Sequence, residues 1–350
     1  MKRYRIVQWS TGNVGRQALQ AVLDDPKLEL VGVHAFGSAK VGIDAGELAG
    51  RQGVGVVATN DVDALVALAP DCVSYMPPAI DYELVTRFLR AGINVVTTGD
   101  FLTGSHHPDQ RAALEVAARQ GGASFMGTGL DPGFANLVAG FLTGACRRVH
   151  HVTFAETVDC SNYAIAEAWT TVGFGRPLEA RITRFGPEPS VPGLAFFEAL
   201  DLIAEMLSVE LDSKEAVVEA AAAVRDIDLG WMRFPKGTVA GQRRTYTGYA
   251  RGRPFVELVI TWTMSDALDR QWGGPDGFRI EIEGEPRIDA TLRFGPSQVE
   301  GLSNESDVMS LLMVGTAMTA VHAIPFVCDA APGILTLSQL PIFGARHAVA

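Results

Sequence analysis

The chain has 350 residues, of which 47% are hydrophobic and 20% are charged, and its formal net charge is −11 at pH 7. This length exceeds what one hydrophobic core usually organises, so we expect two domains. An acidic chain without a cluster of lysine and arginine is not expected to bind nucleic acid or an anionic membrane surface. Composition therefore leaves a small molecule as the expected ligand class.

The four cysteines lack the spacing of zinc sites and of disulfide frameworks; they are Cys72, Cys146, Cys160 and Cys328. We therefore expect reduced thiols and a cytoplasmic protein, since the N-terminus also lacks the apolar region of a signal peptide. No grouping of His, Cys and Asp has metal-ligand spacing, so no metal is expected.

One apolar run, residues 311–327, is nearly long enough to span a bilayer. It contains His322 and Pro325 and is rich in small residues. We therefore expect a buried helix here and no membrane partner.

Strands and helices alternate through the first part of the chain. Strands are predicted at residues 4–9, 28–36, 72–75, 93–97 and 123–127, and helices at 14–26, 61–69, 80–91 and 108–120. Such alternation is typical of a parallel sheet with helices on both faces. The sequence thus predicts an α/β fold with a Rossmann-type doubly wound parallel sheet.

The pattern changes after Gly144. A strand is predicted at 151–158, helices at 195–207 and 213–225, and paired strands that turn at 251–253 and 284–286. These elements predict a mixed α/β substrate and oligomerisation domain with an open antiparallel sheet. The helix after Ser303 is expected to return to the first domain. We therefore predict a discontinuous dinucleotide-binding domain, 1–130 with 304–350, and a substrate domain, 131–303.

The turn after the first strand carries a dinucleotide fingerprint of the form S-x-G-x-x-G. Its residues, all predicted to bind the cofactor, are Ser10, Thr11, Gly12, Asn13, Val14, Gly15 and Arg16. The second and third glycines of the usual pattern remain, and they allow the backbone to approach a pyrophosphate and the helix to pack on the strand. Amides at the helix N-terminus are then expected to bind phosphate.

The end of the second strand decides between the two dinucleotides. NAD enzymes place an acidic residue there to bind the ribose 2′-hydroxyl, but no carboxylate stands between His34 and Lys40. Ser38 and Lys40 are suited to a 2′-phosphate, so NADP is predicted as the cofactor, with His34 beside it and NAD as the alternative. A solvated surface lysine is the other interpretation of Lys40. Tyr75, at the end of the third strand, is also predicted to lie at the cofactor.

The first half resembles dihydrodipicolinate reductase. It has a DAGELAG segment at 44–50 and Thr97-Thr98-Gly99 after the fourth strand. The resemblance implies that Thr97, Thr98 and Gly99 lie at the nicotinamide. A reductase motif of two histidines followed by Lys and a D-x-P-S-G turn is absent after His150 and His151. Dihydrodipicolinate reduction is therefore not expected.

The whole chain is similar to 2,4-diaminopentanoate dehydrogenase and the related NAD(P)-dependent amine dehydrogenases. The stretches that carry the resemblance are 9–16, 127–134, 160–163, 173–177, 237–241 and 321–332. It implies a homodimer that oxidises an amine or reduces an imine. These enzymes resemble one another in a glutamate after the fourth strand, where this chain has Asp100, one methylene shorter.

Asp100 is the predicted catalytic carboxylate, because an amine must lose a proton before it gives up hydride. Its other interpretation is a turn residue before Gly104. His106 and His107 follow in the same loop, and we predict His107 as a proton shuttle. The alternative is that both histidines only cover the helix that starts at Pro108.

Six residues are predicted to contact the substrate. They are Asp131, Phe134, Tyr163, Trp169, Phe174 and His322. Core packing is the alternative for Tyr163, Trp169, Phe174 and His322, and a turn position for Asp131. The sequence thus predicts an NADP(H)-dependent oxidoreductase that acts on a small amine, imine or carbonyl compound. The alternative is a non-catalytic sensor or scaffold that binds NADP(H).

Overall fold

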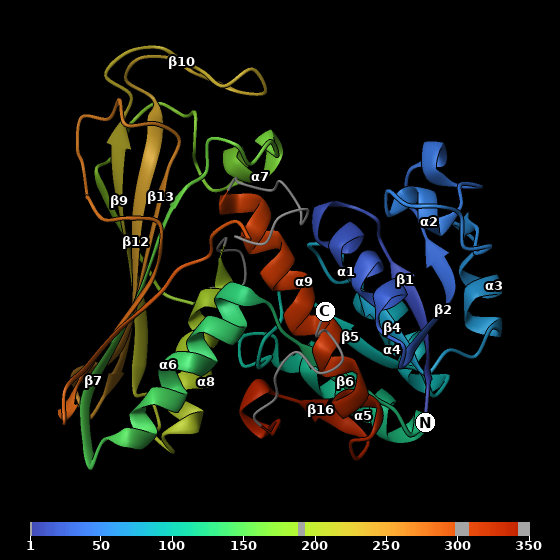
Figure 1. Cartoon of the computed structure of the whole chain (residues 1–350). Coiled ribbons are helices and arrows are strands. Elements are labelled where there is room, and N and C mark those ends of the chain that lie inside the picture. Colours follow the sequence, from blue (N-terminus) through green and yellow to red (C-terminus); the bar gives the residue numbers. More distant parts are fainter. Residues whose placement is uncertain (1, 188–192, 298–307, 342–350) are drawn as a thin grey trace. The chain divides into compact units, whose positions relative to one another are not determined.

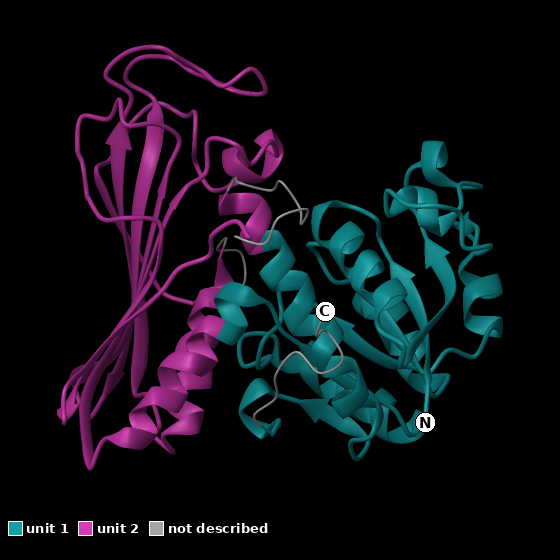
Figure 2. Cartoon of the chain, viewed as in Figure 1, with its two compact units in different colours: residues 1–134, 313–350 teal, residues 135–312 magenta. Residues whose placement is uncertain are grey.

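The computed structural model describes residues 2–187, 193–297 and 308–341. The chain divides into two compact units (Figure 2). The first unit comprises Met1–Phe134 and Met313–Ala350, and the second comprises Ala135–Leu312. The chain passes from the first unit to the second at residues 134–135, where a helix begins, and back at residues 312–313, within another helix.

A seven-stranded parallel sheet forms the centre of the first unit (Figure 1). Its strands, in spatial order, are β16 (Gly333–Leu335), β6 (Ser124–Gly127), β5 (Asn94–Thr97), β4 (Cys72–Tyr75), β1 (Tyr4–Trp9), β2 (Leu28–His34) and β3 (Ala58–Thr59). The order reverses on either side of β1, as in a doubly wound sheet. The predicted Rossmann-type fold is confirmed, and β3 and β16 are additional short edge strands.

Helices cover both faces of this sheet. The described helices are α1 (Asn13–Asp24), α2 (Ala45–Leu48), α3 (Val62–Ala67), α4 (Tyr82–Arg90), α5 (Pro108–Gly121) and the C-terminal part of α9 (Val308–Cys328). One core joins strand residues such as Val73 and Phe125 to α3, α4 and α5, and a second core joins Leu19 of α1 to Val33. Apolar surface is thus buried on both sides, which a parallel sheet requires.

Local capping explains where these helices begin and end. Asp61 and Asp81 accept hydrogen bonds from the amides of Ala64 and Leu84 at the starts of α3 and α4. Helix α5 starts at Pro108, whose missing amide hydrogen would have had no helical partner, and ends before Gly122 at φ 72°.

The DAGELAG segment has a structural role in this chain. The Asp44 carboxylate accepts hydrogen bonds from the amides of Gly46, Val54 and Gly55. These bonds lower the pKa of Asp44, with the Val54 amide contributing most. The motif therefore holds α2 against the loop that leads to β3.

The second unit is built on a seven-stranded mixed sheet (Figure 1). Its order is β15 (Ile288–Leu292), β14 (Gly277–Glu285), β7 (Arg148–Asp159), β13 (Arg253–Thr263), β12 (Val239–Ala250), β9 (Ser213–Ala222) and β8 (Ile182–Phe185). Strands β10 (Ile227–Asp228) and β11 (Arg233–Phe234) form a separate hairpin. All neighbours in the large sheet are antiparallel except β13 and β7, so the predicted open antiparallel sheet contains one parallel pair.

The described part of this unit also contains α6 (Ala135–Leu142), α7 (Ala166–Thr171), α8 (Leu194–Met206) and the first residues of α9. Helix α8 packs on β12 and β13 and also against α6. Gly140 allows this close approach, since a Cβ atom there would lie 2.4 Å from Sδ of Met206. Figure 1 shows α6 and α8 together on one face of the sheet.

The predicted helix at 213–225 is wrong, because this segment forms strand β9. Its alanines and glutamates favour a helix locally, but they also alternate with a period of two. Ala216 and Ala220 are buried, while Glu219 on the other face pairs with Arg270. Hydrogen bonds to β8 and β12 on both sides outweigh the helix propensity.

Among the described residues, α9 is the one helix long and apolar enough to cross a membrane by length and composition. Helices buried in a protein core satisfy the same criteria. Ala320, Ile324 and Val327 of α9 are fully buried within the first unit. Burial of this part of α9 accounts for its apolar composition.

Candidate active site

The turn between β1 and α1 has the geometry of a dinucleotide loop. Ser10 takes the left-handed conformation, with φ 79°, at the position where the usual fingerprint has its first glycine. Its amide donates to the carbonyl of His34, and its own carbonyl accepts from Nε2 of Gln8 at 3.0 Å. Serine therefore adopts the conformation of the missing glycine with the help of two neighbours.

The two remaining glycines differ in what surrounds them. A Cβ atom at Gly15 would lie 2.3 Å from the carbonyl oxygen of Ser10, so only glycine lets α1 pack this closely on the turn. At Gly12 the nearest atom would be Oγ of Ser10 at 3.8 Å. No described residue thus demands a glycine at position 12, whereas close approach of a ligand would.

Helix α1 starts just beyond Gly12, with Asn13 and Val14 in its first turn. Its first amides have no helical acceptors, and the amide of Arg16 is the first to bond within the helix, to the carbonyl of Gly12 at 2.8 Å. Thr11, which precedes Gly12, is buried. The loop is therefore suited to the pyrophosphate of a dinucleotide.

Lys40 lies directly beside this loop. Its Nζ donates to the carbonyl oxygen of Thr11 at 2.7 Å, and the side chain is exposed. Ser38 and Lys40 belong to one short 3₁₀ turn after β2, and Ser38 is exposed as well. A cation and a hydroxyl thus stand at the end of β2, where the ribose of a dinucleotide is bound.

The last residues of β1 and β2, Trp9 and His34, form a stacked pair of rings. The indole of Trp9 and the imidazole of His34 are parallel within 2°, with centroids 3.9 Å apart. Burial lowers the pKa of His34 to about 4, so this ring is neutral at pH 7. The exposed ring of Phe36 meets the edge of His34 at 4.7 Å.

Buried polar atoms gather at this carboxyl edge of the sheet. In the described part of the chain, hydrogen-bond partners are missing for Nε1 of Trp9, Nδ1 of His34, Oγ of Ser74, Oγ1 of Thr128 and Oε1 of Gln8. Each belongs to or directly follows β1, β2, β4 or β6. Unsatisfied buried polar groups are rare in proteins and often mark a site that binds a ligand. Gln8, Trp9, Ser74 and Thr128 were missed as site residues at the sequence level, although Trp9 and Thr128 lie in the stretches 9–16 and 127–134 that carry the family resemblance.

The loop after β5 presents Asp100 at the same edge. Oγ1 of Thr97 accepts from the amide of Gly99 at 2.9 Å, and the amide of Thr98 donates to the carbonyl of Tyr75. Phe101 is buried with its ring 5.0 Å from that of Phe125. Asp100 is exposed between Gly99 and this anchor. The structure thus brings Thr97, Thr98, Gly99 and Asp100 together at one edge.

The two histidines of this loop have different surroundings. His107 precedes α5 and is half-buried, with its ring 6.0 Å from that of Tyr82 at the start of α4. Nδ1 of His106 lies 3.0 Å from Oγ of Ser105. Helices α4 and α5 both start at the sheet edge that carries Asp100, because they follow β4 and β5.

Tyr75 lies in the core of the first unit. Its side chain is 2% exposed, and its hydroxyl accepts a hydrogen bond from the amide of Asp81. Only the Tyr75 carbonyl, bonded to Thr98, reaches the sheet edge. We therefore assign Tyr75 to the core and leave its side chain out of the candidate site.

The segment after β6 carries Asp131 and Phe134. It begins beside β5, since the amide of Thr128 donates to the carbonyl of Thr97 at 2.9 Å. Both carboxylate oxygens of Asp131 are buried, and Phe134 is partly buried with its amide bonded to Gly129. These two residues thus follow a strand end of the same sheet edge.

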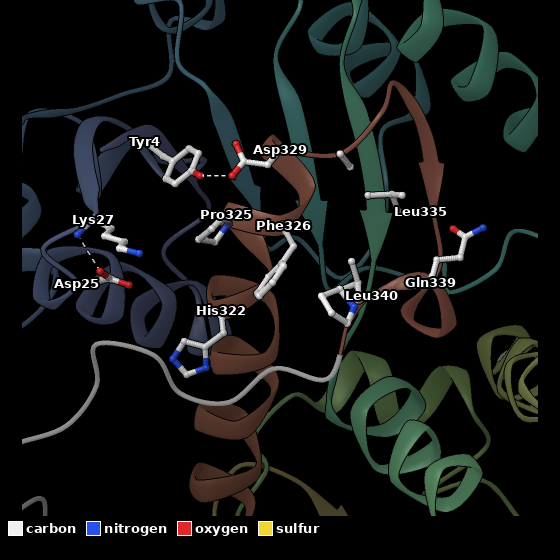
Figure 3. A pocket seen from close by; sticks show the side chains of 12 residues that line it. Tyr4, Asp25, Lys27, His322, Pro325, Phe326, Asp329, Leu335, Gln339 and Leu340 are labelled. Carbon is white, nitrogen blue, oxygen red and sulfur yellow. Dashed lines mark hydrogen bonds between the residues drawn. The ribbon is translucent and has the colours of Figure 1, made fainter. Parts of the chain in front are cut away.

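His322 lies elsewhere in the first unit. It lines a cavity of about 410 Å³ with Tyr4, Asp25 and Asp329 (Figure 3). Tyr4 begins β1, so this cavity is at the amino end of that strand, whereas the cofactor loop follows its carboxyl end. Burial lowers the pKa of His322 and Asp25 opposes this shift. The structure does not bring His322 together with the residues of the cofactor loop.

The predicted aromatic residues form a cluster in the second unit. The ring of Trp169 lies 5.8 Å from Tyr163, 5.3 Å from Phe174 and 5.6 Å from Trp262. Phe174 is completely buried, Trp169 is 5% exposed, and Tyr163 is partly buried. Packing accounts for Phe174 and most of Trp169, while Tyr163 retains some exposed surface.

Comparisons with known proteins agree with this architecture. The family described as the 2,4-diaminopentanoate dehydrogenase C-terminal domain matches residues 135–349, and the dihydrodipicolinate reductase N-terminus matches residues 6–126. An amine dehydrogenase of Streptomyces virginiae is 30% identical over 96% of both chains. The 2,4-diaminopentanoate dehydrogenase of Acetoanaerobium sticklandii is 23% identical over 98% of this chain and 94% of its own. The solved amine dehydrogenase of Mycobacterium smegmatis shares the fold with a TM-score of 0.78, at 21% identity over 98% of both chains.

The two glycines of the loop should respond differently to alanine. Gly15→Ala should lower the free energy of unfolding by about 1–3 kcal/mol, because its methyl group overlaps the Ser10 carbonyl. Gly12→Ala should cost less than about 1 kcal/mol, since the space beside it is open. Urea unfolding of both variants measures the difference. Equal losses would contradict the assigned roles.

His34 should make stability depend on pH. Its pKa is about 4 in the folded chain against 6.5 for a free side chain, so the unfolded chain binds an extra proton as pH falls from 6.5 towards 4. Stability should therefore fall over this range. His34→Phe keeps a ring on Trp9 but cannot titrate, and it should reduce this fall by about 1–3 kcal/mol. Urea unfolding of both proteins at several pH values is the measurement, and identical pH profiles would refute the assignment.

Proposed function

Because the chain belongs to the family of amine dehydrogenases and 2,4-diaminopentanoate dehydrogenases, we propose that it is an NADP(H)-dependent oxidoreductase for a small amine, imine or carbonyl compound. The carrying observation is the carboxyl edge of the first sheet. The Gly12 loop, Lys40 and Asp100 follow strands β1, β2 and β5 at this edge, which also carries buried polar atoms that no described residue satisfies.

Cofactor binding follows from the loop. The first amides of α1 would bind the pyrophosphate, Gly12 would give it room, and Gly15 keeps the helix close to β1. A bound nicotinamide supplies the hydride donor or acceptor, and Thr97, Thr98 and Gly99 are proposed to hold it. The family resemblance and the place of these residues beside β4 support this assignment.

A preference for NADP over NAD rests on charge. No carboxylate stands between His34 and Lys40 to bind a 2′-hydroxyl, and His34 is neutral. Lys40 is the positive charge at this position, with Ser38 as a further donor. These groups are suited to a 2′-phosphate.

Asp100 is proposed as the carboxylate that acts on the substrate nitrogen. In amine oxidation it would accept a proton from the ammonium group and release it to solvent, and the carboxylate, negative again, would then stabilise the iminium group that develops. In the opposite direction it would return the proton to nitrogen. Its exposure and its place directly after Gly99 make it accessible to a substrate. His107, close by at the start of α5, is proposed to exchange this proton with solvent.

Turnover distinguishes this proposal from a sensor or scaffold that only binds NADP(H). The protein is mixed with NADPH, ammonia and a panel of small ketones and aldehydes, and NADPH absorbance is followed. Oxidation of many equivalents of NADPH per chain supports the enzyme. NADPH binding without any turnover across the panel supports the non-catalytic alternative.

Lys40→Ala should weaken NADPH binding about tenfold and leave NADH binding nearly unchanged, because one charge-assisted contact to the 2′-phosphate is lost. Fluorescence titration with both cofactors measures the ratio. Lys236→Ala, at an exposed lysine of the second unit, is the control. An unchanged ratio, including an equal loss for both cofactors, would refute Lys40 as the source of the preference and leave it only its bond to Thr11. Equal affinity of the wild-type chain for NADPH and NADH would refute the NADP preference itself.

Asp100→Asn should lower kcat by about 10²–10⁴ while NADPH affinity is retained, since the amide keeps the shape but cannot take a proton. Asp109→Asn, in the first turn of α5, is a matched control that should keep the activity. Asp100→Glu restores the carboxylate with the side chain of the related enzymes and should recover part of the rate. An unchanged rate in Asp100→Asn would return Asp100 to a turn residue.

We further propose a homodimer formed through the large sheet of the second unit. One face of this sheet packs on α8, while residues such as Thr153, Thr245 and Val259 point to the other face and are partly exposed. A second copy would cover that face. Light scattering at micromolar concentration should give twice the chain mass of 37.4 kDa. A monomer mass would contradict the proposal.

A further inference from the structure

The second unit contains a cavity of about 510 Å³ that the proposed chemistry does not use. It lies along β9 and β12, and its wall includes Val218, Ala220, Phe185, Gln242 and Arg244. Arg244 and Val218 are direct cross-strand neighbours, and so are Gln242 and Ala220. The wall is therefore apolar on one strand and polar on the next.

Arg244 is a buried cation with only neutral partners. It is 4% exposed, yet no described carboxylate forms an ion pair with it. Nε and Nη2 donate to Oε1 of Gln242 at 2.9 and 2.7 Å, and Nη2 also donates to the carbonyl of Val172 at 3.0 Å. Buried charges in proteins are normally paired, because moving a charged group out of water costs roughly several kcal/mol per ion.

Two N–H groups of this guanidinium remain for a ligand. The guanidinium has five N–H donors, and its three hydrogen bonds to described residues use Nε and Nη2 alone. Nη1 has no described hydrogen-bond acceptor. Gln242 is also 4% exposed, and its amide nitrogen donates to Val172. Gln242 and Val172 therefore fix the guanidinium from one side.

The acidic groups nearby are engaged elsewhere. Glu215 and Glu219 of β9 alternate with Val218 and so point to the opposite face of the sheet, where they bond to Tyr249 and Arg270. On the cavity face, Glu156 of β7 accepts from Nε1 of Trp262 at 2.7 Å. The Trp262 ring lies 5.5 Å from the Arg244 guanidinium carbon. Trp262 contacts both groups and is placed between their strands.

The rim of the cavity carries two further charges. Arg176 and Glu179 line it and are both exposed, so solvent screens them. Their charges cancel, which leaves Arg244 as the net charge of the described cavity wall. Thr171 and Thr183 add hydroxyl groups. The cavity is thus suited to a ligand with one negative group and an apolar body.

We propose that this cavity binds the carboxylate of a small organic acid, with Arg244 as its cation and Val218, Ala220 and Phe185 in contact with its apolar part. Both free N–H groups are on Nη1, and a charge-assisted hydrogen bond from Nη1 to a carboxylate oxygen would give the guanidinium its anionic partner. The site lies wholly within the second unit and does not depend on the proposed oxidoreductase function.

Calorimetric titration of the full chain without dinucleotide tests the proposal, with hexanoate as the probe and hexanamide as its neutral match. Hexanoate should bind at least about tenfold more tightly than hexanamide, as expected for one charge-assisted pair. Arg244→Met should abolish this difference. Arg243→Met is the matched control, because Arg243 is adjacent on β12 and points to the other face of the sheet.

Folding of each variant is checked by circular dichroism and by urea unfolding. If Arg244→Met does not fold, Val218→Phe serves instead, since it keeps the cation but fills the apolar half of the cavity. It should retain acetate binding and lose the extra affinity for hexanoate. Equal binding of hexanoate and hexanamide by the wild-type chain, tighter binding of inorganic phosphate than of acetate, or full hexanoate affinity in a folded Arg244→Met variant would overturn the proposal.

Discussion

The contact between Gly15 and the carbonyl of Ser10 is the constraint on which the candidate active site depends. A side chain at position 15 would force α1 away from the end of β1, because its Cβ atom would stand 2.3 Å from that oxygen. With glycine there, the first amides of α1 lie at the sheet edge. The same turn bonds to His34 and, through Thr11, to Lys40. One close approach therefore fixes the helix, the end of β2 and the cation relative to one another.

Much of the fold is predictable because its signals are local. The parallel strands of the first unit are short apolar runs bounded by Gly, Pro and Asp, and the caps at Asp61, Asp81 and Pro108 mark helix starts directly in the sequence. Strand β9 shows where this fails. Its residues have helix propensity, and only pairing with β8 and β12, which are distant in sequence, makes it a strand. β3 and β16 are too short to produce any pattern.

The candidate site divides in the same way. The fingerprint, Lys40 and Asp100 could be predicted because each directly follows a predicted strand, and strand ends of one parallel sheet share an edge. The stack of Trp9 on His34 arises only when β1 and β2 pair. Likewise, the hydroxyl of Tyr75 turns to Asp81, and α9 carries His322 to the amino end of β1. Side-chain direction, unlike strand position, depends on the packed core.

The two cations that we assign to ligands act through different physics. Lys40 is exposed, so water and salt screen its charge, and the contribution that we propose for it depends on its position beside the fingerprint loop. Arg244 is buried, so its attraction for an anion is stronger, but it has also lost its own hydration. Gln242 and Val172 replace part of that hydration. A ligand carboxylate would replace the remaining hydration of Arg244. A buried guanidinium with neutral partners therefore favours an anionic ligand, whereas an exposed lysine alone does not.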